Sequence, residues 1–159
     1  MSTKIKIAFY KDIGKPINFT LSSYTGIFTW GVPSYSHVEI GFFINGEWKY
    51  FSSTMRDGAK GTRWISSKDL FKHRERWDVY DYEAKKDQEE MLSRIRSIIP
   101  AKYDMWGILG FVTPLGLVNS FKAWYCSEAC WYVLFEWMKR ISPKRMYKLL
   151  KKDLELTDG

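Results

Sequence analysis

The sequence predicts an α+β fold, in which an antiparallel sheet packs against helices that lie to one side of it. Two observations support this class. The first half contains short runs of β-branched and aromatic residues, one of them arranged around a hairpin dipeptide. The second half contains apolar residues at helical spacing, with capping and helix-breaking residues at the ends of the runs. Strands and helices grouped in this way are typical of α+β domains.

Alternation predicts the first strand. Residues 4–10 (KIKIAFY) place three apolar side chains on one face, which is the period-two pattern of a strand: Ile5, Ile7 and Phe9. A further short strand is expected in 76–83. Segment 18–31 is ambiguous, and we favour a helix or helical turn that ends at Gly31.

Residues 36–53 carry the clearest hairpin signal. Two β-rich runs flank Asn45-Gly46, the dipeptide that suits a type I′ turn. A two-residue turn pairs Ile44 with Glu47, and this register then fixes every further pair of the two strands.

Two helices are predicted from their caps. In 86–99, Asp87 can cap the helix and Pro100 ends it. One apolar stripe runs along this helix: Met91, Leu92, Ile95, Ile98 and Ile99. In 142–154, Ser142 is the expected cap, with a proline at the first helical position.

A third helix is predicted over 126–140. Glu128 lies early in this segment, whereas Lys139 and Arg140 lie late, an order that suits the helix dipole. The segment also contains both cysteines of the chain, four residues apart.

The composition is that of one folded domain spanning residues 1–159: 45% of the residues are hydrophobic and 18% are aromatic. The formal net charge of +7 favours acidic partners such as nucleic acid, anionic lipid or an anionic cell-wall polymer. The N-terminal residues lack the apolar stretch of a signal peptide, so we expect a cytoplasmic location, with phage-encoded delivery or another route to the cell envelope as the alternative. The uncharged run 105–121 is expected to be buried or to contact a membrane surface.

The two cysteines differ in their expected environments. Cys126 lies where its helix begins, and there N–H groups and the positive end of the helix dipole stabilise a thiolate. Cys130 lies one turn further in, so we expect it in the core. A nucleophilic thiol needs a general base. His73 lies among charged residues and is expected to be exposed, whereas His37 begins the hairpin. Each of these residues taken alone also suits an ordinary structural role.

The pair of motifs SHVEI (36–40) and YCSE (125–128) resembles the circularly permuted papain-like cysteine hydrolases, the YiiX-like branch of the NlpC-type superfamily related to lecithin:retinol acyltransferase. The resemblance covers most of the chain, and the histidine precedes the cysteine as in the permuted order. It implies His37 as general base, Cys126 as nucleophile and an acyl-enzyme intermediate. It also implies the Cys126 N–H as one oxyanion donor, with Tyr103 as the candidate for a second.

The third member of the site is less obvious. The family commonly supplies a carboxylate from the strand after the histidine, but this strand offers Ser52, Ser53 and Thr54 and no acid. The hairpin register places Glu39 on the His37 face and opposite Ser52, so we expect Glu39 to orient His37, with Ser52 or Thr54 assisting. The alternative is that Glu39 is a rim charge paired with a Lys or Arg. Residues 55–64 are expected to form a loop beside the sheet.

The leading functional hypothesis is a cysteine hydrolase, an amidase or peptidase that cleaves an acyl bond in a cell-wall peptide or another anionic substrate. The alternative is a lipid-directed acyltransferase or thioesterase that uses 105–121 and the basic C-terminus at a membrane. A non-catalytic module that binds nucleic acid is third, since no nucleic-acid motif is present. No cofactor and no metal are expected, because the sequence lacks nucleotide-binding glycine patterns and zinc-ligand spacing.

Overall fold

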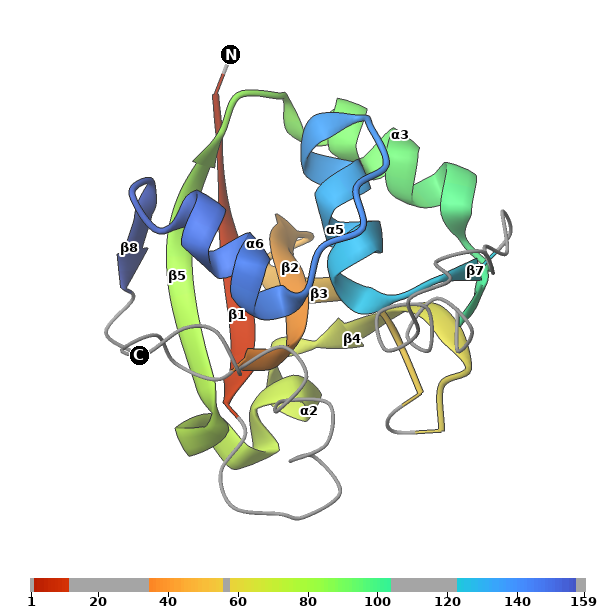
Figure 1. Ribbon diagram of the computed structural model, residues 1–159. Helices are drawn as coiled ribbons and strands as arrows, with labels where there is room; N and C mark the ends of the chain where they lie inside the picture. Colours follow the sequence, from red (N-terminus) through yellow and green to blue (C-terminus); the bar gives the residue numbers. More distant parts are fainter. Residues whose placement is uncertain (1, 12–34, 56–57, 104–122, 157–159) are drawn as a thin grey trace, which may run out of the picture.

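A computed structural model describes residues 2–11, 35–55, 58–103 and 123–156 (Figure 1). These residues form an α+β fold around a sheet with strand order β7-β6-β4-β3-β2-β1-β5-β8. All neighbouring strands are antiparallel except β6 and β7, which run parallel. The strands are β1 (Thr3–Lys11), β2 (Tyr35–Ile44), β3 (Glu47–Thr54), β4 (Gly61–Ser66), β5 (Trp77–Ala84), β6 (Lys102–Tyr103), β7 (Ala123–Trp124) and β8 (Leu154–Leu156).

Three longer helices cover one face of the sheet, as the sequence predicts: α3 (Gln88–Ile98), α5 (Cys126–Phe135) and α6 (Pro143–Leu150) (Figure 1). Their apolar residues form one core with alternate side chains of the central strands, such as Ile7 of β1 and Ile40 of β2. The short helix α2 (Ser67–Leu70) and the 3₁₀ turn η1 (Phe71–Arg76) lie on the opposite face. Leu70 packs there with Ala8, Tyr50 and other residues that point away from the main core. The sheet is therefore covered on both faces around β1, β2 and β3.

The first strand is confirmed with its predicted face. Ile5, Ile7 and Phe9 are fully buried in the main core, whereas Ala8 between them belongs to the smaller cluster on the other face. The predicted strand in 76–83 is confirmed as β5, which pairs with β1 along its whole length.

The hairpin is confirmed, and its register is confirmed over the five pairs next to the turn; the expected pair Glu39–Ser52 lies beyond the last pair of this ladder. Asn45 and Gly46 adopt φ angles of 52° and 82°, the left-handed values that a type I′ turn requires at both central positions. The pairing then runs from Ile44 opposite Glu47 to Ile40 opposite Phe51. The turn chemistry has therefore set which residues of β2 and β3 lie opposite one another.

The predicted caps of α3 and α6 are also confirmed. The Asp87 carboxylate accepts a hydrogen bond from the Glu90 N–H at 2.8 Å, and the Ser142 hydroxyl accepts one from the Arg145 N–H at 3.3 Å. The apolar stripe of α3 is buried at Met91, Ile95 and Ile98, while Leu92 and Ile99 are half-buried.

The prediction that the third helix extends to residue 140 is wrong at its C-terminal end. α5 stops at Phe135, because Glu136 takes a left-handed conformation with φ of 66° and its carboxylate accepts a hydrogen bond from Arg94 at 2.9 Å. Lys139 therefore lies outside the helix, where its ammonium packs over the rings of Trp131 and Trp137 at 4.8 and 5.0 Å.

The expectation of a loop over 55–64 is wrong for its second half. Gly61–Ser66 forms β4, which pairs with β3 from Lys49 opposite Ser66 to Thr54 opposite Gly61. Gly61 has φ of 156°, and a Cβ built there would lie 1.8 Å from the Ala101 carbonyl oxygen. A glycine is thus required where β6 joins the sheet. Segments 18–31 and 105–121 lie outside the described residues. Within the described ranges, no helix has both the length and the apolar character needed to cross a membrane.

Candidate active site

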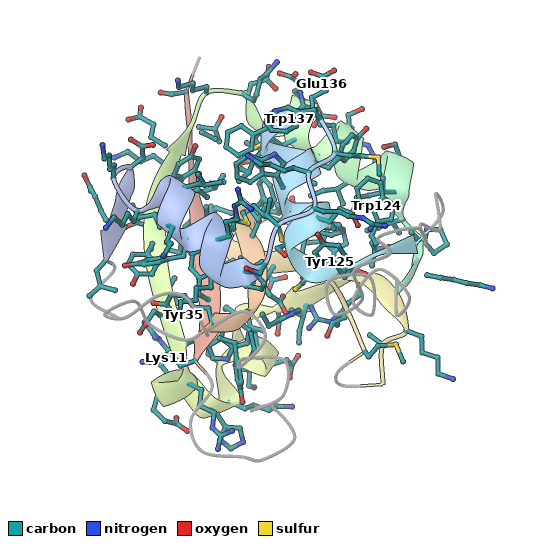
Figure 2. The ribbon with its side chains drawn as sticks, viewed as in Figure 1. Lys11, Tyr35, Trp124, Tyr125, Glu136 and Trp137 are labelled. Carbon is teal, nitrogen blue, oxygen red and sulfur yellow. The ribbon has the colours of Figure 1, made fainter. Side chains whose placement is uncertain are left out.

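The candidate site lies where β2 and β3 separate. Beyond the pair Ile40–Phe51, the Val38 carbonyl accepts a hydrogen bond from the Ser52 hydroxyl at 2.8 Å. The Cys130 thiol donates to the same carbonyl at 3.7 Å. Side chains thus replace the strand ladder here, and α5 begins against this opening, in contact with both strands. Figure 2 shows Trp124 and Tyr125 at this start of α5, with Glu136 and Trp137 at its other end.

Cys126 is the first residue of α5, and its thiol interacts with His37 of β2. The imidazole and the thiol lie close enough for charge attraction and hydrogen bonding between them to shift the pKa of each. Both residues are almost completely buried, with exposed fractions of 4% for His37 and 5% for Cys126. The backbone N–H groups of Val38 and Ser127 also point at the sulfur. The Val38 N–H is available for this contact because β3 has already diverged from β2.

Glu39 contacts the His37 ring on its other side. Glu39 Oε1 lies 3.1 Å from His37 Nε2, and the carboxylate has no exposed surface. Since Glu39 occupies Nε2, Nδ1 is the ring nitrogen left for the thiol. This arrangement has the order of a nucleophile, a base and an orienting acid. Glu39 is therefore a buried partner of His37 and not a residue at the rim.

Arg63 completes the arrangement, and the sequence analysis did not identify it. Its guanidinium forms two hydrogen bonds with Glu39: Nη1 donates to Oε2 at 3.0 Å and Nη2 donates to Oε1 at 2.9 Å. The expected alternative for Glu39, pairing with a Lys or Arg, is thus present alongside the His37 contact. No sequence pattern indicated this residue, because Arg63 falls in a segment rich in glycine and basic residues, a composition typical of a loop.

The charges of the site favour an ionised pair. Burial opposes ionisation of Cys126, but attraction and hydrogen bonding to His37 and the two backbone N–H groups outweigh it, so the pKa of the thiol lies below its ordinary value. Burial likewise opposes protonation of His37, but Cys126 and Glu39 outweigh it and raise the pKa of the imidazole. Burial also disfavours the Glu39 carboxylate, yet His37 and Arg63 hold its pKa below the usual value.

Cys130 has the opposite character. Burial raises the pKa of its thiol well above the ordinary value, and the nearby charges of Cys126 and Glu39 raise it further. Its thiol contacts the Val38 and Phe51 carbonyl oxygens at 3.7 and 3.9 Å. The two cysteines therefore differ as the sequence indicates, with Cys126 at the helix start and Cys130 in the core.

The remaining candidates occupy different positions. The Ser52 hydroxyl donates to the Val38 backbone, and Thr54 is buried at the end of the β3–β4 ladder. Ser52 thus supports the strand and is not seen to contact His37. Tyr103 pairs with Trp124 between β6 and β7, but its side chain lies outside the described part of the chain. His73 is exposed and lies 3.7 Å from Glu75. It therefore lacks the burial of His37, as the sequence predicts.

Comparison with known proteins gave no match to a family model, a curated protein or a solved structure. Among the described residues, no group of three or more His, Cys, Asp or Glu side chains is arranged to hold a metal ion.

Proposed function

We propose that this chain is a cysteine hydrolase with a permuted papain-like domain, which cleaves an acyl bond through a Cys126 acyl-enzyme. One observation carries the proposal: the Cys126 thiol at a helix N-terminus interacts with a buried histidine, and Nε2 of that histidine is held by a buried carboxylate. These are the three parts that thiol hydrolysis needs, and they come from two distant segments of the chain.

The reaction follows from the charges of the pair. The Cys126 thiolate attacks the carbonyl carbon, and the imidazolium of His37 gives its proton to the leaving amine or alcohol as the acyl bond breaks. Water then loses a proton to His37 and attacks the thioester. Collapse of the second tetrahedral intermediate expels Cys126 and releases the acid. Glu39 keeps the imidazole oriented through both steps.

The start of α5 is suited to hold the oxyanion. Asp87 and Ser142 cap the N-termini of α3 and α6 with their side chains, whereas Tyr125 at the N-cap of α5 makes no side-chain cap hydrogen bond. The first N–H groups of α5 are therefore not occupied by a capping side chain, and the Cys126 N–H is the first proposed donor. Tyr103 remains the proposed second donor on the strength of the resemblance, with β6 entering the sheet beside Trp124.

The substrate is proposed to be an amide or ester with anionic character, such as a cell-wall peptide, which suits the net charge of +7. A cytoplasmic location, or phage-encoded delivery to the envelope, is part of this proposal. The lipid-directed alternative depends on 105–121, which lies outside the described residues.

Labelling with a thiol-directed acyl probe tests the proposal. The wild-type chain should label at Cys126 below the pH range of an ordinary thiol, and Cys126→Ala should abolish labelling. Cys130→Ala is the matched control, because that thiol has a raised pKa and should leave labelling unchanged. His37→Ala should slow labelling strongly. Equal labelling of both cysteines, or an unaffected His37→Ala chain, would refute the catalytic pair.

A further inference from the structure

Arg63 reaches Glu39 from a strand that is not its neighbour. Arg63 lies on β4 opposite Ser52 of β3, and β3 separates β4 from β2, which carries Glu39. The guanidinium crosses the intervening strand where that strand has a small side chain. Both terminal nitrogens then bind the carboxylate in a bidentate fork, and the Arg63 side chain is only 15% exposed.

The protonation state of Glu39 decides which nitrogen of His37 carries the proton. An ionised carboxylate only accepts hydrogen bonds, so the imidazole must donate from Nε2 and present the Nδ1 lone pair to Cys126. A protonated Glu39 would donate to Nε2 instead, and the neutral ring would then carry its proton on Nδ1. In that tautomer the ring cannot accept the proton of the thiol.

A carboxylate without exposed surface does not stay ionised without a compensating charge. His37 supplies such a charge only when the imidazole is protonated. Arg63 supplies it permanently, because a guanidinium stays protonated throughout the physiological range. Its fork also holds the two carboxylate oxygens in place, so that Oε1 stays directed at the imidazole.

We propose that Arg63 is a positioning residue of this site, which keeps Glu39 ionised and oriented and thereby sets the His37 tautomer that activates Cys126. The inference rests on the proposed pair of Cys126 and His37. It adds a residue on a third strand that binds the Glu39 carboxylate and acts through it.

The rate of Cys126 alkylation by iodoacetamide, measured against pH, tests this proposal without knowledge of the substrate. In Arg63→Met the midpoint of the profile should rise by about one pH unit or more, so that alkylation in the acid limb slows roughly tenfold. In Arg63→Lys the midpoint should lie between those of the wild type and Arg63→Met, because an ammonium keeps the positive charge but cannot form the bidentate fork. Arg94→Met is the matched control: Arg94 is equally a buried, ion-paired arginine, bound to Glu90 and Glu136, and its loss should leave the midpoint unchanged.

A double variant separates action through Glu39 from a general effect on the fold. If Arg63 acts through Glu39, adding Arg63→Met to Glu39→Gln should change the midpoint little beyond Glu39→Gln alone. Additive shifts would overturn the proposal, as would an Arg63→Met profile that coincides with the wild type. If Arg63→Met does not fold, Arg63→Lys carries the test, and a wild-type midpoint there would count against the proposal. A wild-type chain with the profile of an ordinary thiol would instead refute the catalytic pair itself.

Discussion

Replacing Glu39 by glutamine should destabilise the fold in a way that depends on pH. The substitution keeps the size of the side chain but removes the charge that faces His37 and Arg63. Breaking a buried ion pair from one side costs about 3–5 kcal/mol. We expect about 3 kcal/mol at neutral pH, the lower end of that range, because the amide oxygen still accepts a hydrogen bond and Arg63 is 15% exposed. For a chain of this size that corresponds to a fall of about 6–12 °C in Tm.

The pH dependence gives the sharper test. The pKa of Glu39 is lowered in the folded state, so its contribution is present above the unfolded value near 4.5 and is lost as pH falls through the folded pKa. Urea unfolding followed by tryptophan fluorescence, at neutral pH and in steps below 4.5, should show the gap between wild type and Glu39→Gln shrinking. Glu47→Gln is the control, because Glu47 is 54% exposed and pairs with Lys49 at the surface. A gap that stays constant with pH, or that equals the control, would refute the assignment of Glu39 as a buried anion.

Three other substitutions test separate parts of the structure. Cys130→Ala should leave the pH profile of Cys126 alkylation unchanged while costing about 1–3 kcal/mol in urea unfolding for the lost packing; a shifted profile would contradict the different roles of the thiols. Gly61→Ala should destabilise the fold by more than about 2 kcal/mol and raise amide exchange in β6, because its Cβ meets the Ala101 carbonyl; protected amides there would count against it. Asp87→Ala should cost about 1 kcal/mol and lower helical circular dichroism, and no change would show that the cap is dispensable.

Local chemistry explains what the sequence could predict. Asn45-Gly46 fixes the hairpin because few residues tolerate two successive left-handed positions, and that turn gave the register of β3 against β2. Alternation along β2 places Glu39 on the His37 face. The helix caps Asp87 and Ser142 are equally local signals, each accepting from an N–H three residues ahead. The start of α5, and hence the position of Cys126, is indicated by a different local signal, the acidic side chain of Glu128 in the first turn.

Contacts between distant segments explain what the sequence could not predict. Arg63 binds Glu39 across an intervening strand, and nothing in the neighbouring residues indicates that partner. Basic residues between glycines are typical of loops, and pairing with β3 overrides that tendency. The end of α5 is similar, because Glu136 is held by Arg94 from 42 residues away. A helical pattern that continues into Lys139 gives no sign of that contact.

The turn at Asn45-Gly46 also fixes how β2 and β3 are aligned at the candidate site, although the turn does not touch that site. β2 is held in place by its pairing with β1, so one inserted or deleted residue at the turn would shift β3 by one residue and turn its side chains to the other face relative to β2. Ser52 and Arg63, which pair across β3 and β4, would then turn towards the apolar core beneath α5, and Arg63 would no longer reach Glu39. Loop-length variants of this surface turn should therefore abolish the chemistry of Cys126 as completely as a substitution at the thiol, although five residue pairs lie between the turn and the opening where α5 begins.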